Sequence, residues 1–175
     1  MVNEEALWKE VTAFHGHACP GLAIGFKAAL LAIDILDITR NKLEEDTVCV
    51  TENDACGVDA LQYILGTTLG SGTLRLNVVG KNAYNIFNRK NNKKVRLFLK
   101  NLPSFPSKKE RMEYILQTPA KELFLELVPS MDFPEFARIM ESKKCDICNE
   151  TTAIDYLDHI DGKNICKTCM QRSIN

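Results

Sequence analysis

Residues 20–39 read PGLAIGFKAALLAIDILDIT, and this stretch predicts a long helix at the centre of the fold. Pro20 can occupy the first turn of a helix, where its missing backbone N–H is not needed. From Leu22 to Leu36 the residues are apolar nearly all round the expected helix, which is typical of a helix that other elements cover. The remaining segments are therefore expected to pack around it.

The segments on either side of this helix predict an α+β fold. Shorter helices are expected over residues 4–14, 57–65, 108–116 and 120–127, and strands over residues 46–52, 74–79, 83–88 and 95–99. Turn residues at 80–82 and 91–92 separate the last three strands, so an antiparallel meander is the simplest arrangement. We predict helices packed on a mainly antiparallel sheet.

The length of 175 residues leaves room for one core of ordinary size and a small appendage. We assign residues 1–130 to the α+β core, 131–143 to a linker and 144–175 to a cysteine-rich module. The composition, with 45% hydrophobic and 26% charged residues, excludes disordered and low-complexity classes. No apolar run approaches the roughly 20 residues of a membrane span, and the acidic start lacks the order of a signal peptide. A cytoplasmic protein is expected.

The charged residues are unevenly distributed, although the net charge is only -1. Residues 1–60 carry 4 basic and 11 acidic side chains, whereas residues 81–112 carry 10 basic side chains and a single acid, Glu110. This basic block could attract nucleic acid or an anionic small molecule. The alternative is an edge hairpin of the sheet, whose lysines prevent aggregation.

Two Cys-x-x-Cys pairs lie near the end of the chain, separated by 17 residues; they comprise Cys145, Cys148, Cys166 and Cys169. This spacing predicts a structural zinc site, because four thiolates satisfy tetrahedral Zn²⁺ and leave no open position. Rubredoxin-like iron binding and reactive thiols are the alternatives. A hairpin around Asp161-Gly162 and a short helix from Cys169 would complete a treble-clef-like finger. About 30 residues contain too little apolar material to fold unaided, so the metal should supply much of the folding free energy.

The segment just before the central helix reads FHGHACPG, residues 14–21. In an extended segment alternate side chains face the same way, so His15, His17 and Cys19 could project together as metal ligands. Cys19 also directly precedes the helix, where free backbone N–H groups favour a thiolate. The alternative is a capped helix preceded by two hydrogen-bonded histidines.

A second cluster, ENDACGVD at residues 52–59, lies where a strand leads into a helix, so that Cys56 again meets free backbone N–H groups. Structural roles are the alternative, with Asp54 as a helix cap and Cys56 as a small buried residue. Cys49, in the middle of the strand, is expected to be a core residue. The glycine-rich turn at residues 66–73 could bring backbone N–H groups to an anion, or it could be a bare loop.

Three motifs in this order resemble the FmdE family of formylmethanofuran dehydrogenase proteins. They are FHGHxCPGL at residues 14–22, ENDACxVDA at residues 52–60 and GxTxGxGxL at residues 66–74. The four-cysteine tail also resembles the treble-clef zinc finger that some members append. The resemblance implies an α+β core, often a homodimer, with a cavity of His and Cys groups that can hold a transition metal.

Carried over by position from that family, the candidate metal-binding and catalytic residues are His17, Cys19 and Cys56, with His15, Asp54 and Asp59 around them. In this scheme the thiolates and an imidazole would bind zinc, nickel or iron, and an aspartate would orient a ligand or move protons. Lys81 and the basic block would receive an anionic substrate. Thr67 stands where the family commonly has a cysteine; if that cysteine is a ligand or redox partner in other members, this chain cannot use it so.

The resemblance implies a role in or beside the one-carbon chemistry of a molybdenum or tungsten enzyme, in the setting of methanogenesis, with other components of that enzyme as partners. Two other classes stay open. A nucleic-acid-binding regulator would use the finger and the basic block, although the charges of the finger nearly cancel. A metal carrier or sensor would release the core metal to a partner.

Overall fold

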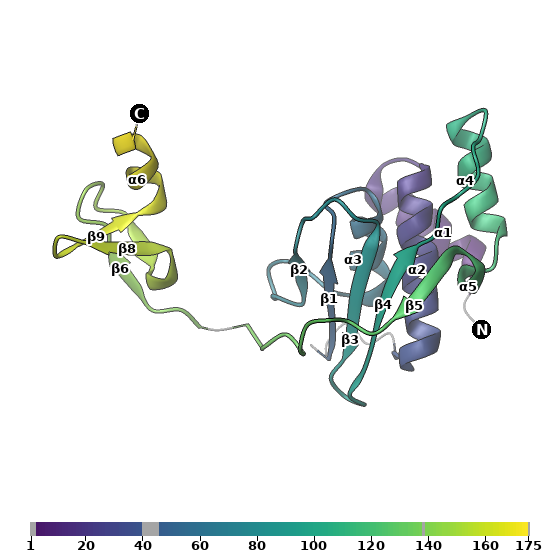
Figure 1. The fold of residues 1–175 in the computed structure, drawn as a ribbon, viewed down its shortest axis with the longest axis horizontal. Helices are drawn as coiled ribbons and strands as arrows, with labels where there is room; N and C mark the ends of the chain where they lie inside the picture. Colours follow the sequence, from purple (N-terminus) through teal and green to yellow (C-terminus); the bar gives the residue numbers. More distant parts are fainter. Residues whose placement is uncertain (1–2, 40–45, 138, 175) are drawn as a thin grey trace. The chain divides into compact units, whose positions relative to one another are not determined.

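The computed structural model describes residues 3–39, 46–137 and 139–174. Contacts divide the chain into two compact units, Met1–Phe136 and Ala137–Asn175. In the first unit, helices cover one face of a five-stranded sheet, and the second unit contains two short hairpins and a helix (Figure 1). The predicted α+β class is confirmed.

Helix α2 (Pro20–Leu36) is the central helix of the first unit, as predicted, and most of its side chains are buried. Pro20 lies in its first turn, and the Cys19 thiol caps it by accepting the Leu22 N–H at 3.3 Å. The helix ends earlier than predicted because Asp37 takes a left-handed conformation, with φ 50°, that ends the hydrogen-bond ladder. None of the helices in the described ranges is long and apolar enough to cross a membrane.

Four further helices lie in the first unit: α1 (Glu4–His15), α3 (Gly57–Leu65), α4 (Lys108–Gln117) and α5 (Ala120–Leu123). All four contact α2, so the central helix is the common packing partner of the helical layer. The expected helices at the start of the chain and after the first strand are confirmed.

The sheet has the order β2-β1-β3-β4-β5 and consists of β1 (Thr47–Thr51), β2 (Leu74–Leu76), β3 (Ala83–Asn88), β4 (Lys93–Leu99) and β5 (Phe124–Leu127). Strands β1 and β2 pair in parallel, and the other neighbours are antiparallel. The predicted meander is therefore wrong for its first strand. A helix, α3, connects β1 to β2, and a helical crossover returns the chain parallel to the strand that it left. The sequence pattern of β2 does not indicate which strand it joins.

The expected helix over residues 120–127 is also wrong in its second half. After one short helical turn, Phe124 begins β5, which pairs with β4 through Leu99 and Phe124 at one end and Arg96 and Leu127 at the other. Short apolar runs suit either a helix or a strand. The open hydrogen-bonding edge of β4 decides in favour of the strand.

Strand β1 is buried on both faces, as predicted. Cys49 faces the helical layer, whereas Val48 and Val50 form a second cluster with Phe87 on the opposite face. Met131 and Phe133 cover this cluster, and the Phe133 ring lies 5.3 Å from that of Phe87. These two residues belong to the segment that the sequence analysis assigned to a linker, but they pack on the sheet of the first unit.

Glu52 follows β1 and makes a bidentate ion pair with Arg96 of β4. Arg96 Nε donates to Glu52 Oε1 at 2.6 Å and Nη2 to Oε2 at 2.8 Å, while Asn85 Nδ2 also donates to Oε1 at 3.0 Å. The hydrogen bond from Arg96 lowers the pKa of the Glu52 carboxyl, against a smaller opposing effect of burial. This ion pair connects the end of β1 to β4 across β3, and the candidate site residues follow Glu52 closely in the chain.

We expect Glu52→Gln to lower the free energy of unfolding by about 2 kcal/mol at neutral pH, because it leaves a nearly buried guanidinium without its carboxylate. The pKa of Glu52 is lower in the folded than in the unfolded protein. The ion pair therefore stabilises the fold at pH values above the ordinary pKa of Glu, and this contribution is lost as pH falls through the folded-state pKa. The variant should therefore lose less stability on acidification than the parent. Urea unfolding at neutral pH and at about pH 4 measures both effects.

Glu5→Gln is the matched control, since Glu5 pairs with Lys9 on the surface and its pKa is lowered in the same direction. Solvent screens that pair, so its removal should have no measurable effect at either pH. Equal behaviour of the two variants would contradict the role of the Glu52 pair.

The second unit consists of β6 (Ser142–Lys144), β7 (Thr151–Ala153), a 3₁₀ turn η1 (Ile154–Tyr156), β8 (Leu157–Ile160), β9 (Lys163–Cys166) and α6 (Lys167–Ile174). The predicted hairpin around Asp161-Gly162 is β8–β9, and both turn residues have positive φ, 49° and 77°. Two central residues with positive φ fit the twist of a two-residue hairpin. Helix α6 begins at Lys167, slightly before the predicted start at Cys169. Two hairpins followed by a helix give the treble-clef order.

Candidate metal centres

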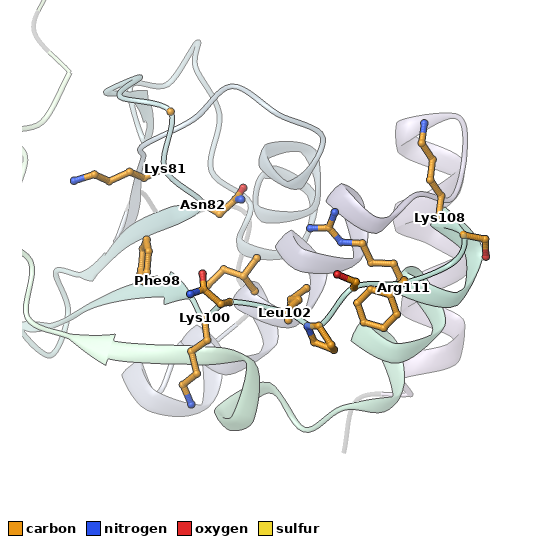
Figure 2. A pocket seen from close by; sticks show the side chains of 14 residues that line it. Lys81, Asn82, Phe98, Lys100, Leu102, Lys108 and Arg111 are labelled. Atoms are coloured by element: carbon orange, nitrogen blue, oxygen red, sulfur yellow. The ribbon is translucent and has the colours of Figure 1, made fainter.

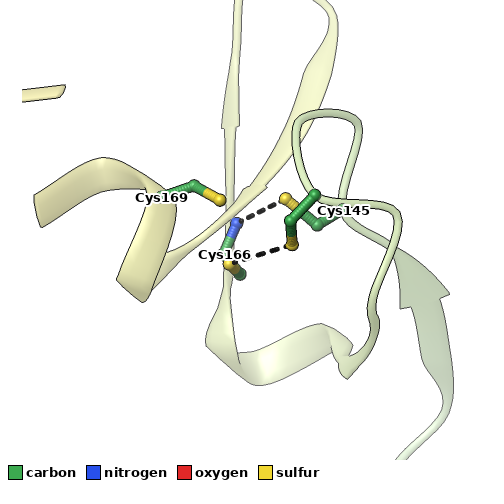
Figure 3. A group of neighbouring side chains, drawn as sticks. Cys145, Cys166 and Cys169 are labelled. Atoms are coloured by element: carbon green, nitrogen blue, oxygen red, sulfur yellow. Dashed lines mark hydrogen bonds between the residues drawn. The ribbon is translucent and has the colours of Figure 1, made fainter. Parts of the chain in front are cut away.

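The four cysteines of the second unit form one compact group. The sulfur atoms of Cys145, Cys148, Cys166 and Cys169 all lie within 4.8 Å of one another, and those of Cys148 and Cys166 are 3.9 Å apart. Figure 3 shows the thiols approaching a common centre from the β6–β7 turn, the end of β9 and α6. Sulfur atoms bound at about 2.3 Å in a tetrahedron are about 3.8 Å apart, so this group fits a metal ion.

The charges in this group favour a bound cation. Backbone N–H groups of Cys148 and Cys166 point at Cys145 and lower the pKa of its thiol to about 6; the Cys166 N–H lies 3.4 Å from the sulfur. Burial and hydrogen bonds with the other three thiols raise the pKa of Cys169 to about 12. The Cys145 thiol thus ionises readily and the Cys169 thiol does not. Several thiolates so close together repel one another unless a cation lies between them. The donor set fits a closed structural site.

A second group lies in the first unit, between α1 and α2. The ligand atoms of His15, His17 and Cys19 all lie within 4.8 Å of one another. The expected extended segment is not what brings them together, because His15 is still in the last turn of α1 and Gly16, with φ 91°, reverses the chain. Cys19 is then the N-cap of α2. A helix end and a helix start therefore place the three side chains side by side.

His15 is oriented by a carboxylate from another helix. Its Nδ1 lies 2.6 Å from Asp59 Oδ2, in the first turn of α3, and its Nε2 lies 4.0 Å from Cys19 Sγ. When Nδ1–H donates to the carboxylate, the neutral ring has its free lone pair on Nε2, facing the thiol. Metal-binding histidines are usually held by such a hydrogen bond.

Cys56 approaches Cys19 from the start of α3 but is outside the tight group of three ligand atoms. A Cβ placed on Gly21 would lie 3.8 Å from Cys56 Sγ and 4.0 Å from Cys19 Sγ, so both sulfurs border the same small space. Burial raises the pKa of Cys56, and the hydrogen bond and charge of Cys19 raise it further. Its thiol makes no capping hydrogen bond. The two cysteines are therefore neighbours at the starts of two packed helices.

His15 and Cys56 line a hollow of about 320 Å³. Asp54 and Asp59 lie on its polar side, and Leu69, Leu74 and Leu76 form an apolar wall. Sequence reasoning missed this wall. Its residues come from the glycine-rich turn and β2, and only the parallel crossover places these beside Cys56. His17 is exposed beside His15, with ring centroids 4.6 Å apart.

Other residues singled out from the sequence lie elsewhere. Cys49 is completely buried in the core, as expected, and burial raises its pKa. Thr67 is buried, and no hydrogen-bond partner for its hydroxyl is found within the described ranges. In the glycine-rich turn, the Thr68 N–H donates to Thr73 Oγ1 and the Ser71 N–H to Thr68 Oγ1. These backbone groups are satisfied internally, which favours the bare-loop interpretation. Lys81 lines a different cavity from that beside His15.

The fold and the two groups together define an α+β protein with a candidate His/Cys metal centre in its core and a four-cysteine group that can hold a metal ion in a small second unit. A family model described as "FmdE, Molybdenum formylmethanofuran dehydrogenase operon" matches residues 14–125. The chain belongs to the FmdE family.

Two known proteins are similar to this chain. A "probable S-adenosyl-L-methionine-binding protein" of Archaeoglobus fulgidus is 29% identical over 169 residues, which cover 78% of this chain and 46% of that protein. The chain thus spans less than half the length of this relative. The crystal structure of a tungsten formylmethanofuran dehydrogenase FmdE-like protein from Syntrophus aciditrophicus superimposes with a TM-score of 0.68 and 22% identity, covering 98% of this chain and 94% of the other. This likeness supports the fold.

Proposed function

We propose that the core of this protein binds a transition-metal ion through His15, Cys19 and Cys56, with His17 as a further donor. Imidazole and thiolate donors together suit zinc, nickel or iron. We further propose that this centre acts in or beside the one-carbon chemistry of a molybdenum or tungsten enzyme, and that the four-cysteine site of the second unit holds zinc.

The contact between His15 and Asp59 carries the proposal. A histidine that only packs against a helix needs no carboxylate at 2.6 Å, whereas a ligating histidine needs one ring nitrogen held so that the other faces the ion. The thiol of Cys19 lies on the side of Nε2, and the thiol of Cys56 borders the same space.

The surrounding hollow gives the centre room for a substrate. The donors His15, Cys19 and Cys56 leave a fourth position, which a substrate could take in place of His17, and a bound ion there would polarise a substrate atom. The apolar wall of Leu69, Leu74 and Leu76 would exclude water from one side, and the exposed Asp54 carboxylate could accept a hydrogen bond from a substrate on the other. The name of the A. fulgidus relative adds S-adenosyl-L-methionine to the small molecules worth titrating, because carboxylates suit its positive charge.

Metal analysis of the full chain tests this proposal. The parent should hold about two metal ions per chain, one in all-sulfur and one in mixed nitrogen and sulfur coordination by X-ray absorption. Cys19→Ala should remove the mixed site alone, and Asp59→Asn should weaken it by about 10–100-fold, because it loses the carboxylate that orients His15. Cys49→Ala is the control, since Cys49 is a fully buried cysteine that is not among the proposed ligands and should leave both ions bound.

A single all-sulfur ion in the parent, unchanged by Cys19→Ala, would contradict the core centre while leaving the four-cysteine site intact. Loss of both ions in Cys49→Ala would show that the readout reports folding and not ligation.

A further inference from the structure

A cavity of about 680 Å³ in the first unit is separate from the metal centre. Three parts of the chain line it: the turn 80–82 before β3, the stretch 98–107 after the middle of β4, and the first turn of α4. Its volume lies within the range of small-molecule sites. Figure 2 shows these segments around the open space.

The cavity has a strong excess of positive charge. Its lining includes Lys81, Lys100, Lys108 and Arg111, and none of the lining residues is Asp or Glu. Within the described ranges, Lys81, Lys108 and Arg111 have no hydrogen bond or ion pair from their side-chain nitrogens, and Lys100 Nζ donates only to the Lys121 carbonyl, at 3.4 Å. Four cations that share one hollow repel one another when no acidic side chain lines it, and an anion would relieve this repulsion.

The arrangement of α4 directs the charge of Arg111 to the cavity. Lys108 and Arg111 are three residues apart and therefore share one side of the helix, whereas Lys109 pairs with Glu113 elsewhere on it. In Figure 2 the guanidinium of Arg111 extends from α4 toward Asn82, while Lys81, Lys100 and Lys108 extend outward from the rim. An arginine fork matches the geometry of phosphate oxygens.

The rest of the lining is apolar and partly aromatic. Phe98, Leu102 and Phe105 are half-buried and face the cavity between the charged groups. Such a surface suits the flat body of an organic molecule.

The positions of the basic residues argue against an extended nucleic acid. The basic block does not form an edge hairpin, because β3 and β4 are interior strands. Lys93 and Lys94 lie at the other end of this hairpin from the cavity, where they contact Asp37 and the Met131 carbonyl. The basic residues of the 81–112 block therefore lie in two separate groups and do not form a continuous positive stripe.

We propose that this cavity binds a small organic anion that carries a phosphate group, with the phosphate held by Arg111, the lysines at the rim adding to the attraction, and the flat body against Phe98 and Phe105. The site does not require the metal. It is connected to the metal centre through the chain, because the Lys81 N–H donates to the Glu52 carbonyl at 3.2 Å and Asn53 Nδ2 donates to the Lys81 carbonyl at 2.8 Å. Residues 52–53 come shortly before Cys56 in the chain. A ligand in the cavity would therefore lie at the same end of the sheet as the metal centre.

Isothermal titration of the full chain with AMP, inorganic phosphate and adenosine tests this site at about 0.15 M salt, where weak surface attraction is screened. AMP should bind more tightly than either fragment, because only AMP offers both the phosphate and the aromatic body. Arg111→Gln should weaken AMP binding about tenfold or more, the worth of one charge-assisted hydrogen bond. Lys109→Gln, which removes the same charge from the same helix outside the cavity, should change it by less than about twofold.

Absence of AMP binding, or equal losses in Arg111→Gln and Lys109→Gln, would overturn the proposal. Tighter binding of a single-stranded oligonucleotide than of AMP would assign the basic residues to nucleic acid instead. Both substituted side chains are exposed, so unchanged thermal unfolding shows that a loss of binding is local. AMP binding retained in Cys19→Ala would show that the site stands even if the metal centre does not.

Discussion

Removal of metal from the full chain is expected to unfold the second unit and to leave the first unit folded. The buried residues of the second unit within the described ranges are Cys145, Cys166 and Cys169, supported by the half-buried Leu157 and Ile165. This apolar material is too small to offset the conformational entropy of folding. A structural metal in such a module supplies on the order of 10 kcal/mol, so its loss should be decisive.

Hydrogen exchange measured by peptide mass spectrometry can follow both units in the same sample. After treatment with a strong chelator, amides of β8 and β9 should exchange at the rate of an unfolded chain, while those of β3 and β4 stay protected. Cys166→Ser should give the same pattern without chelator. Continued protection of the β8–β9 hairpin in metal-free protein would refute the structural role of the ion.

Gly25→Ala is expected to be among the most destabilising single substitutions in the first unit. A Cβ on Gly25 would lie 2.0 Å from the carbonyl oxygen of Gly57, so α2 and α3 would have to separate. Side chains cannot absorb this clash, because the obstructing atoms belong to the backbone of α3. We expect a loss of at least about 3 kcal/mol in the free energy of unfolding.

The same substitution should impair the core metal centre, because Cys19 and Cys56 stand at the starts of the two helices that it forces apart. Urea unfolding and core metal content measure the two effects. Gly70→Ala is the matched control, since a Cβ there meets no atom within 4 Å and the residue has no positive φ. Equal stability and metal content of the two variants would show that the contact between α2 and α3 is not needed.

Local patterns in the sequence were sufficient for several features. The apolar run after Pro20 predicted the buried central helix, and the turn Asp161-Gly162 predicted a hairpin. The spacing of four cysteines predicted their cluster, because each pair lies within a few residues and closes over a short loop. The helix and the hairpin depend on residues close together in the chain. The cysteine cluster depends on the need of a metal ion for four sulfur ligands.

The core site was predicted in part. The motifs named the residues, but His15 was expected in an extended segment and instead ends a helix. Its hydrogen bond with Asp59 connects residues 44 positions apart, and no local pattern indicates that distance. The apolar wall from Leu69 to Leu76 was missed because its position depends on the parallel pairing of β2 with β1.

Residue types and their spacing were enough to show which segments are apolar enough to be buried, where helices can start, and which thiols can share an ion. Long-range packing was needed to show that Phe124 continues into a strand, that Cys19 and Cys56 border one space, and that Lys81 and Arg111 line one cavity. Local preferences depend on neighbours in the chain, so they can be recognised from the sequence. Strand pairing and helix packing depend instead on hydrogen-bonding edges and apolar faces, which segments far apart in the sequence must cover together.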